Sequence, residues 1–253
     1  MMKQYILLYV FMLMYAFSSA QIVNIEGKRI NSDTTGFDGY VEGSFSMNKN
    51  TSLLMTVITR AQVQYKFKKD LILLLGDWRF TIADDKRFVN DGMAHLRYNH
   101  KFLPWLRWEV FNQIQYNELL SLRMRYLAGT GPRFKLTGKT EQYKAYLGTM
   151  YMFEYEHVQS DDTIYLDHRL SAYFSFTIDP KLPFSITGTT YYQPLLKDWR
   201  DFRVAGMYNF KMRVWKRLDV KIDFSFLYDA RPPATVPSFV FGLATGLVFR
   251  FRP

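Results

Sequence analysis

The sequence contains no cysteine, which excludes a disulfide framework and thiol chemistry. Beyond its first twenty residues it also lacks an apolar run long enough for a membrane-spanning helix, which needs about 20 residues. Its four histidines show neither HxH nor HxxxH spacing, so nothing here predicts a transition-metal site. We therefore expect no metal and no cofactor, and we look for function in the charged and aromatic residues that are present.

Apolar and polar residues alternate from about Tyr40 to Phe251. Side chains of a β-strand point to opposite faces in turn, so this pattern indicates a sheet with one apolar and one charged face. The clearest example runs from Leu218 to Phe226, where one face takes the apolar residues Val220, Ile222, Phe224 and Phe226, and the other takes Asp219, Lys221, Asp223 and Ser225.

Turn-forming residues divide the alternating region into about twelve segments of strand length. We expect strands near residues 38–48, 52–67, 71–82, 88–101, 105–117, 121–136, 142–157, 164–178, 183–193, 200–212, 217–229 and 239–252. An even number of antiparallel strands, joined alternately by short turns and longer loops, is typical of barrels of the bacterial outer membrane. The sequence predicts an all-β fold: one closed antiparallel transmembrane β-barrel of about 12 strands over residues 37–253.

The first twenty residues have the pattern of an export signal. Lys3 precedes an apolar run from Tyr5 to Phe17, and the small residues Ser18, Ser19 and Ala20 follow. We interpret residues 1–20 as a cleaved signal peptide. The polar residues 21–36 are then a short periplasmic lead-in, and the expected location is the cell outer membrane.

Two observations favour an apolar face turned outward to lipid. Twelve strands enclose a lumen too wide for side chains alone to fill, since about eight strands already just fill it. Aromatic residues also collect near both ends of the expected strands, as in the girdles of membrane barrels. One end has Trp105, Trp108, Phe134, Phe174, Phe176, Phe184, Phe249 and Phe251, and the other has Trp78, Phe80, Tyr116, Phe153, Tyr155, Tyr192, Phe202 and Tyr228.

A family resemblance rests on the segment LRMRYLAGTGPRFKL over residues 122–136, together with Tyr146-Leu147-Gly148 and the segment YMFEYE over residues 151–156. The chain resembles the salt-induced outer-membrane proteins, a family of unknown function numbered 481, over about residues 37–252. The segments 92–98 and 189–194 look like versions from Bacteroidetes, which are Gram-negative. The resemblance implies an outer-membrane barrel and brings no catalytic residue with it.

The resemblance also implies partners. The alternating aromatic end from Phe241 to Phe251 resembles the signal that the outer-membrane assembly machinery recognises, although Arg252 and Pro253 follow it. We expect contacts with outer-membrane lipid and with that machinery. No nucleic acid is expected, because the basic residues are spread over many strands and an exported chain does not meet it in the cytoplasm.

Charged residues on the expected inner face form the candidate site. This lumen charge cluster comprises Arg97, Arg107, Glu109, Arg123, Arg125, Arg133, Glu154, Arg169, Asp219, Lys221 and Asp223. Basic groups outnumber acids, so a conducting lumen would favour small anionic solutes. Ion pairs between neighbouring strands, such as Glu109 with Arg97, Arg123 or Arg125, are the alternative and need no solute. Inward leucines and methionines indicate a partly packed, narrow lumen.

Two further functions stay open from the sequence. One is an outer-membrane hydrolase acting on lipid or peptide at the external rim. Its nearest candidate group is Asp167, His168 and Ser171, but His168 and Ser171 have opposite parity and should lie on opposite faces. The other is a soluble secreted barrel that binds an apolar ligand inside. The favoured hypothesis is a non-enzymatic outer-membrane barrel, either structural or a narrow, anion-leaning passive pore.

Overall fold

The computed structural model describes residues 35–49, 53–83, 86–138, 142–180, 183–215, 218–233 and 236–249. The predicted signal peptide over 1–20 lies outside these residues, as do nearly all of the predicted lead-in over 21–36 and the aromatic residue Phe251.

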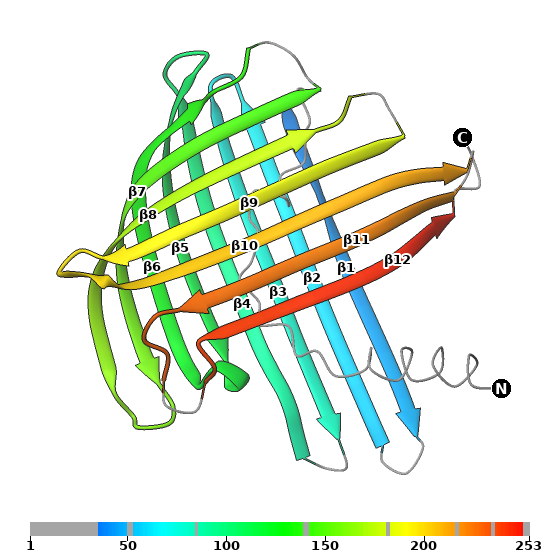
Figure 1. Cartoon of the computed structure of the whole chain (residues 1–253), viewed down its shortest axis with the longest axis vertical. Coiled ribbons are helices and arrows are strands. Elements are labelled where there is room, and N and C mark those ends of the chain that lie inside the picture. Colours follow the sequence, from blue (N-terminus) through cyan, green and yellow to red (C-terminus); the bar gives the residue numbers. More distant parts are fainter. Residues whose placement is uncertain are drawn as a thin grey trace.

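All twelve expected strands are present (Figure 1). Their bounds agree with the predicted ranges to within about three residues at each end. They are β1 (Gly36–Lys49), β2 (Leu53–Phe67), β3 (Asp70–Ala83), β4 (Lys86–Lys101), β5 (Leu106–Asn117), β6 (Leu122–Lys135), β7 (Tyr143–Val158), β8 (Ile164–Ile178), β9 (Phe184–Leu195), β10 (Asp198–Trp215), β11 (Leu218–Asp229) and β12 (Phe239–Phe249).

The strands form one sheet in which each strand pairs antiparallel with the next along the chain. This order is the simplest that short connections allow, because consecutive antiparallel strands need no crossover. One turn of 3-10 helix, Glu118–Leu120, follows β5, and the Asn117 side chain caps it by accepting a hydrogen bond from the Leu120 amide. Among the described residues, no helix is long and apolar enough to cross a membrane.

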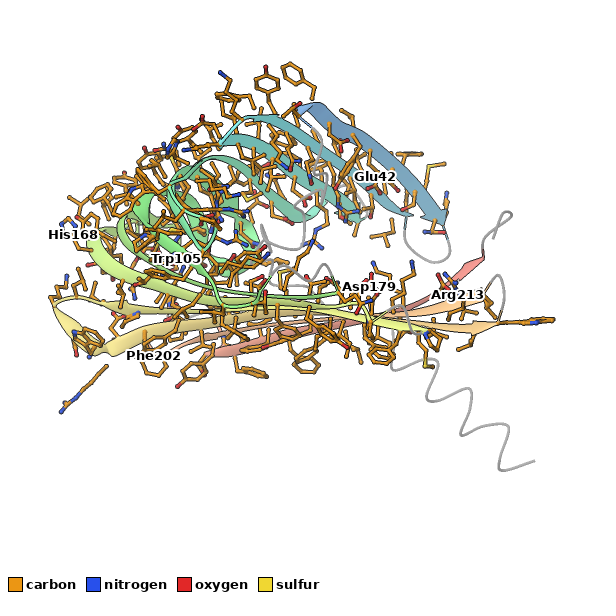
Figure 2. All side chains as sticks on the ribbon, turned by 90° about the horizontal axis from the view of Figure 1, so that it is seen from above. Glu42, Trp105, His168, Asp179, Phe202 and Arg213 are labelled. Carbon is orange, nitrogen blue, oxygen red and sulfur yellow. The ribbon has the colours of Figure 1, made fainter. Side chains whose placement is uncertain are left out.

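The sheet is curled, and its two edges are β1 and β12. Figure 2 shows Glu42 of β1 and Arg213 of β10 on opposite arms of the curl. In the part of the chain that the structure describes, β1 and β12 are not paired with each other. The closure predicted from the sequence is therefore not confirmed. The all-β class, the twelve strands and their antiparallel order are confirmed.

The alternation in sequence separates the two faces of the curled sheet. Charged and amide side chains such as Asp219, Arg97 and Gln62 are buried on the concave face. Large apolar side chains such as Leu247, Leu96 and Trp108 are exposed on the convex face. This arrangement is the reverse of a soluble barrel with an apolar interior, in which the charged face meets water.

Aromatic rings pack against one another on the convex face near both ends of the strands. Phe202 packs between Tyr192 and Tyr228, with ring centroids 5.7 Å away on each side. Trp105, beside the start of β5, stacks on Phe134 at 6.2 Å. Such cross-strand aromatic pairs stabilise a sheet.

Candidate functional site: the charged concave face

A buried carboxylate on β7, Glu154, is the centre of the larger ion-pair network. Its side chain is 1% exposed. The Nε of Arg169 lies 2.6 Å from Oε2, the Nη1 of Arg203 lies 2.6 Å from Oε1, and the Nε of Arg125 also bonds to Oε1. Three guanidinium groups from β6, β8 and β10 therefore converge on one carboxylate.

Additional carboxylates compensate the three arginines. Arg203 donates to Glu156 over 2.9 Å and to Asp229 over 2.8 Å, and Arg169 donates to Asp201 over 3.0 Å. Asp167 also lies 3.9 Å from Arg169, so the group sets three guanidinium charges against five carboxylates. Buried charges are tolerated when they are paired in this way and hydrogen-bonded.

The contact between Arg203 and Glu154 reaches across the concave side of the curled sheet. The two residues lie on β10 and β7, three strands apart, which is about 14 Å along a flat sheet. Their side chains meet only because the sheet is curled toward its charged face. This network, which we call the Glu154 network, therefore closes part of the space that the curl encloses.

A second network is built around Glu109 of β5, which is fully buried. The Nη1 atoms of Arg97 and Arg133 lie 3.4 and 3.3 Å from its two carboxylate oxygens, and the hydroxyl of Tyr173 donates over 2.7 Å. Tyr173 belongs to β8, so this Glu109 network also joins strands three apart. The guanidinium of Arg133 stacks on the ring of Tyr146 at 3.9 Å.

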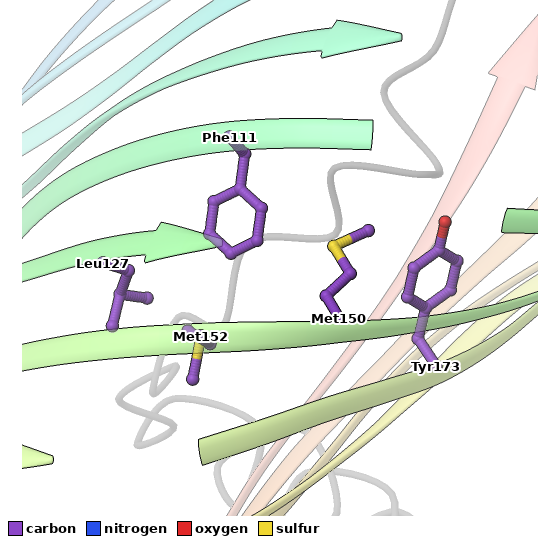
Figure 3. Close-up of a cluster of buried hydrophobic side chains, with 5 residues drawn as sticks. All are labelled: Phe111, Leu127, Met150, Met152 and Tyr173. Carbon is purple, nitrogen blue, oxygen red and sulfur yellow. The ribbon is translucent and has the colours of Figure 1, made fainter. Parts of the chain in front are cut away.

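An apolar cluster separates the two networks. Phe111, Leu127, Met150, Met152 and Tyr173 are buried together on the concave face (Figure 3). The inward position of the two methionines agrees with the parity of β7. The space inside the curl is therefore filled partly by apolar side chains and partly by ion pairs, as the inward leucines and methionines of the sequence predicted.

The predicted pairings of Glu109 are partly correct. Arg97 is a partner, but Arg125 instead bonds to Glu154 and Glu156. Arg123 lies apart, at an end of β6 where the register with β5 and with β7 shifts. It pairs with Asp162 of the β7–β8 connection over 2.6 Å. The hydrogen bond from His157 and the charge of Arg123 lower the pKa of the Asp162 carboxyl.

The remaining predicted residues lie on the concave face outside the two networks. Asp219 is buried and pairs with Lys211 and Arg213, each at 3.3 Å. Lys221 pairs with Asp223 over 2.7 Å where both side chains are partly exposed. Arg107 lies near the ring of Tyr146, at 5.9 Å from its centroid.

Several members of the networks were absent from the predicted cluster. Glu156 shares the parity of Glu154 on β7, so alternation places both on the same face, whereas the predicted cluster has no member on β10, the strand of Arg203. Asp229 and Tyr173 also share the parity of predicted members on their strands, but nothing in the sequence indicates which charges they meet. Asp201 lies between Asp198 and Phe202, where the pairing of β10 with β9 shifts, and it has the parity of Arg203.

A cavity lies between the networks, with about 700 Å³ of empty space, including the part that opens to solvent. Its lining residues include the basic side chains of His95, Arg97, Arg125 and Arg203 and no carboxylate. The carboxylates Glu109 and Glu154 bind the same arginines but do not line the cavity. The surface that an entering solute meets is therefore more positive than the network as a whole.

The nearest candidate for a catalytic triad is separated by the sheet. Asp167 and Ser171 are buried on the concave face, whereas His168 is exposed on the convex face. The ring of His168 instead contacts the hydroxyl of Tyr151 at 2.5 Å. These three residues therefore do not form a charge-relay arrangement, in agreement with the parity argument from the sequence.

Comparisons with known proteins give a family and a weak structural likeness. The model of the family described as "Protein of unknown function, DUF481" matches residues 41–251. Among solved structures, a chain described as the NanC porin in a rhombohedral crystal form is similar with a TM-score of 0.46 and 13% identity. That match covers 85% of this chain and 98% of the other chain. No curated protein matches the sequence.

Proposed function

The chain belongs to the DUF481 family, a family of unknown function, and we propose that it is a closed outer-membrane β-barrel whose constricted lumen is a narrow passive pathway favouring small anions. The observation that carries the proposal is the basic lining of the cavity, enclosed by a concave face of buried ion pairs. The proposal has three parts: insertion in the membrane, closure of the sheet, and the preference for anions.

Insertion is supported by the distribution of polarity over the sheet. The convex face exposes large apolar side chains along most strands, whereas the concave face holds the buried charges. A contiguous exposed apolar surface of this extent is unfavourable in water. An arginine facing lipid at the bilayer midplane would cost roughly 2–4 kcal/mol, so the charged face must look inward in a membrane.

Closure is supported by the geometry of the two edges. An unpaired strand edge presents backbone N–H and C=O groups that lipid cannot satisfy, so a sheet spanning a membrane has no free edges. Each strand runs opposite to the one before it, and an odd number of such reversals separates β1 from β12. The two edge strands therefore run in opposite directions. They can therefore pair antiparallel with each other, which completes a barrel of twelve strands.

The preference for anions is supported by the position of the basic groups, which lie nearer to the cavity than the carboxylates do. A solute in the cavity meets Arg97, Arg125 and Arg203 directly, and their carboxylate partners lie behind them. Rings of basic side chains favour anions in narrow pores. The contacts that cross the lumen also make any pathway narrow.

Conductance in planar bilayers under a KCl gradient tests the pathway. We expect small single-channel currents with a reversal potential on the chloride side, shifted toward zero in Arg125→Gln. Arg231→Gln removes the same charge on the β11–β12 connection, outside the cavity, and should leave the reversal potential unchanged. A reversal potential on the potassium side would reject anion preference, and the absence of any current would assign the networks a purely structural role.

Membrane fractionation and gel migration test the barrel. We expect the mature chain to remain in the membrane fraction until detergent is added, and to migrate faster on gels before boiling than after it. Release into the soluble fraction without detergent would favour a secreted barrel. Identical migration before and after boiling would argue against closure.

A further inference from the structure

We infer that the cavity between the two networks binds a small organic carboxylate with an apolar body, its carboxylate on Arg125 and its body against the apolar cluster. The inference rests on the proposed barrel, because closure is what encloses the cavity. It does not require that the ligand passes through the membrane. The proposed pathway requires only that small anions pass through the cavity. The present inference goes further and names the class of ligand that the cavity binds.

Arg125 carries the first part of the argument. Its Nε bonds to Glu154 and lies 3.5 Å from Glu156, but its buried Nη2 has no hydrogen-bond partner. A buried donor without a partner is unfavourable by about 1–3 kcal/mol, and more when it is charged. Arg125 lines the cavity, and we expect an entering carboxylate to satisfy this donor once the guanidinium turns toward it.

The second part of the argument is the apolar wall that the cavity has beside its arginines. Phe111, Leu127, Met150 and Met152 line the same cavity, and each side chain is at most 6% exposed. An inorganic anion would make no favourable use of these groups. An apolar body would contact them, and the two flexible thioethers allow the wall to adapt to its shape.

Neighbouring amides hold the polar side of the cavity in place. Gln113 contacts His95 over 2.9 Å and Gln115 over 2.5 Å, and Gln193 donates to Ser171 over 3.2 Å. These side chains line the cavity in positions fixed by their own hydrogen bonds. A cavity that combines an apolar wall with a few oriented polar groups is typical of small-molecule sites.

A ligand series on the unaltered protein tests the chemistry. The mature chain in lipid nanodiscs is titrated with sodium benzoate by ligand-observed NMR, with empty nanodiscs as the blank. We expect saturable binding of benzoate, at least about tenfold weaker binding of the uncharged benzamide, and no displacement by equimolar chloride. No saturable binding, equal affinity for benzamide, or displacement by equimolar chloride would each overturn the inference.

Variants test the position of the site. Arg125→Gln should weaken benzoate at least about tenfold, and Arg125→Lys should recover only part of the affinity, because lysine keeps the charge and loses the planar fork. Arg231→Gln, on the β11–β12 connection outside the cavity, should bind like the unaltered protein. Unchanged affinity in a folded Arg125→Gln would overturn the assignment.

The two proposals fail separately. Cation-selective currents together with saturable benzoate binding would reject the anion-leaning pathway and leave the binding site. Anion-selective currents without benzoate binding would reject the site and leave the pathway. If Arg125→Gln does not fold, the ligand series on the unaltered protein still decides the inference.

Discussion

Glu154→Gln should be the most destabilising single change of a charge in this protein. The substitution keeps the size of the side chain but leaves three guanidinium groups, from Arg125, Arg169 and Arg203, without their common carboxylate. Removing one partner of a buried ion pair costs about 3–5 kcal/mol, because the remaining charge stays buried without compensation. We expect a loss in this range, with the neighbouring carboxylates limiting it.

The matched control is Glu42→Gln. Glu42 forms one ion pair, with Arg60 at 3.3 Å, and the two side chains are 51% and 37% exposed. An exposed pair contributes about 0–1 kcal/mol. The comparison therefore varies burial and number of partners while keeping the chemical change constant.

Urea unfolding of the chain refolded into lipid vesicles, followed by tryptophan fluorescence, measures the difference. With an m-value of about 2 kcal/mol per molar urea, the expected loss lowers the Glu154→Gln midpoint by about 1.5–2.5 M, and the control midpoint by less than about 0.5 M. Equal shifts in the two variants would refute the view that the Glu154 network holds the curled sheet together. A double variant with Arg203→Gln should lose less than the sum of the single losses, because the two residues interact directly.

Three further outcomes are expected. Tyr173→Phe should cost about 1–3 kcal/mol in the same unfolding assay, since it leaves the buried carboxylate of Glu109 without one donor. An unchanged midpoint would show that this bond between β8 and β5 is dispensable. Gly131→Ala should cost about 1–3 kcal/mol, because its new Cβ would meet the backbone of β7. Gly138→Ala, with open space around it, should leave the stability unchanged. Similar unfolding midpoints for the two variants would contradict the close approach of β6 and β7. Because the chain has no cysteine, a single introduced cysteine is the only site of thiol labelling. A water-borne maleimide should label Lys221→Cys and leave Leu247→Cys in the membrane unlabelled. The reverse pattern would show that the charged face, and not the apolar face, is turned to lipid.

The alternation of residues was sufficient to predict the strands and the two faces. In β11, for example, Asp219 and Lys221 alternate with Val220 and Ile222, and a period of two has only one assignment to faces once the strand is extended. The same logic put Glu109, Arg97, Glu154 and the inward methionines on one side. These features are local, so the chain alone specifies them.

The exceptions arise where the register changes. Arg123 was assigned to the inner cluster by counting every second residue, but the register of β6 shifts between Leu122 and Met124. One extra residue at a bulge moves the following side chains to the other face. The alternation carries no signal for this shift, because Leu122 and Met124 are both apolar.

The identity of the ion pairs depended on the curl of the sheet. Sequence reasoning pairs charges on neighbouring strands, whereas Arg203 meets Glu154 and Tyr173 meets Glu109 across three strands. Such contacts depend on how sharply the sheet bends, a property of the whole assembly of strands. Within an unbroken register, the chain by itself determined which side chains share a face, because facing is set by neighbours in sequence. Only the tertiary structure decided which of them touch, because contact across the concave side of the sheet is set by its curvature.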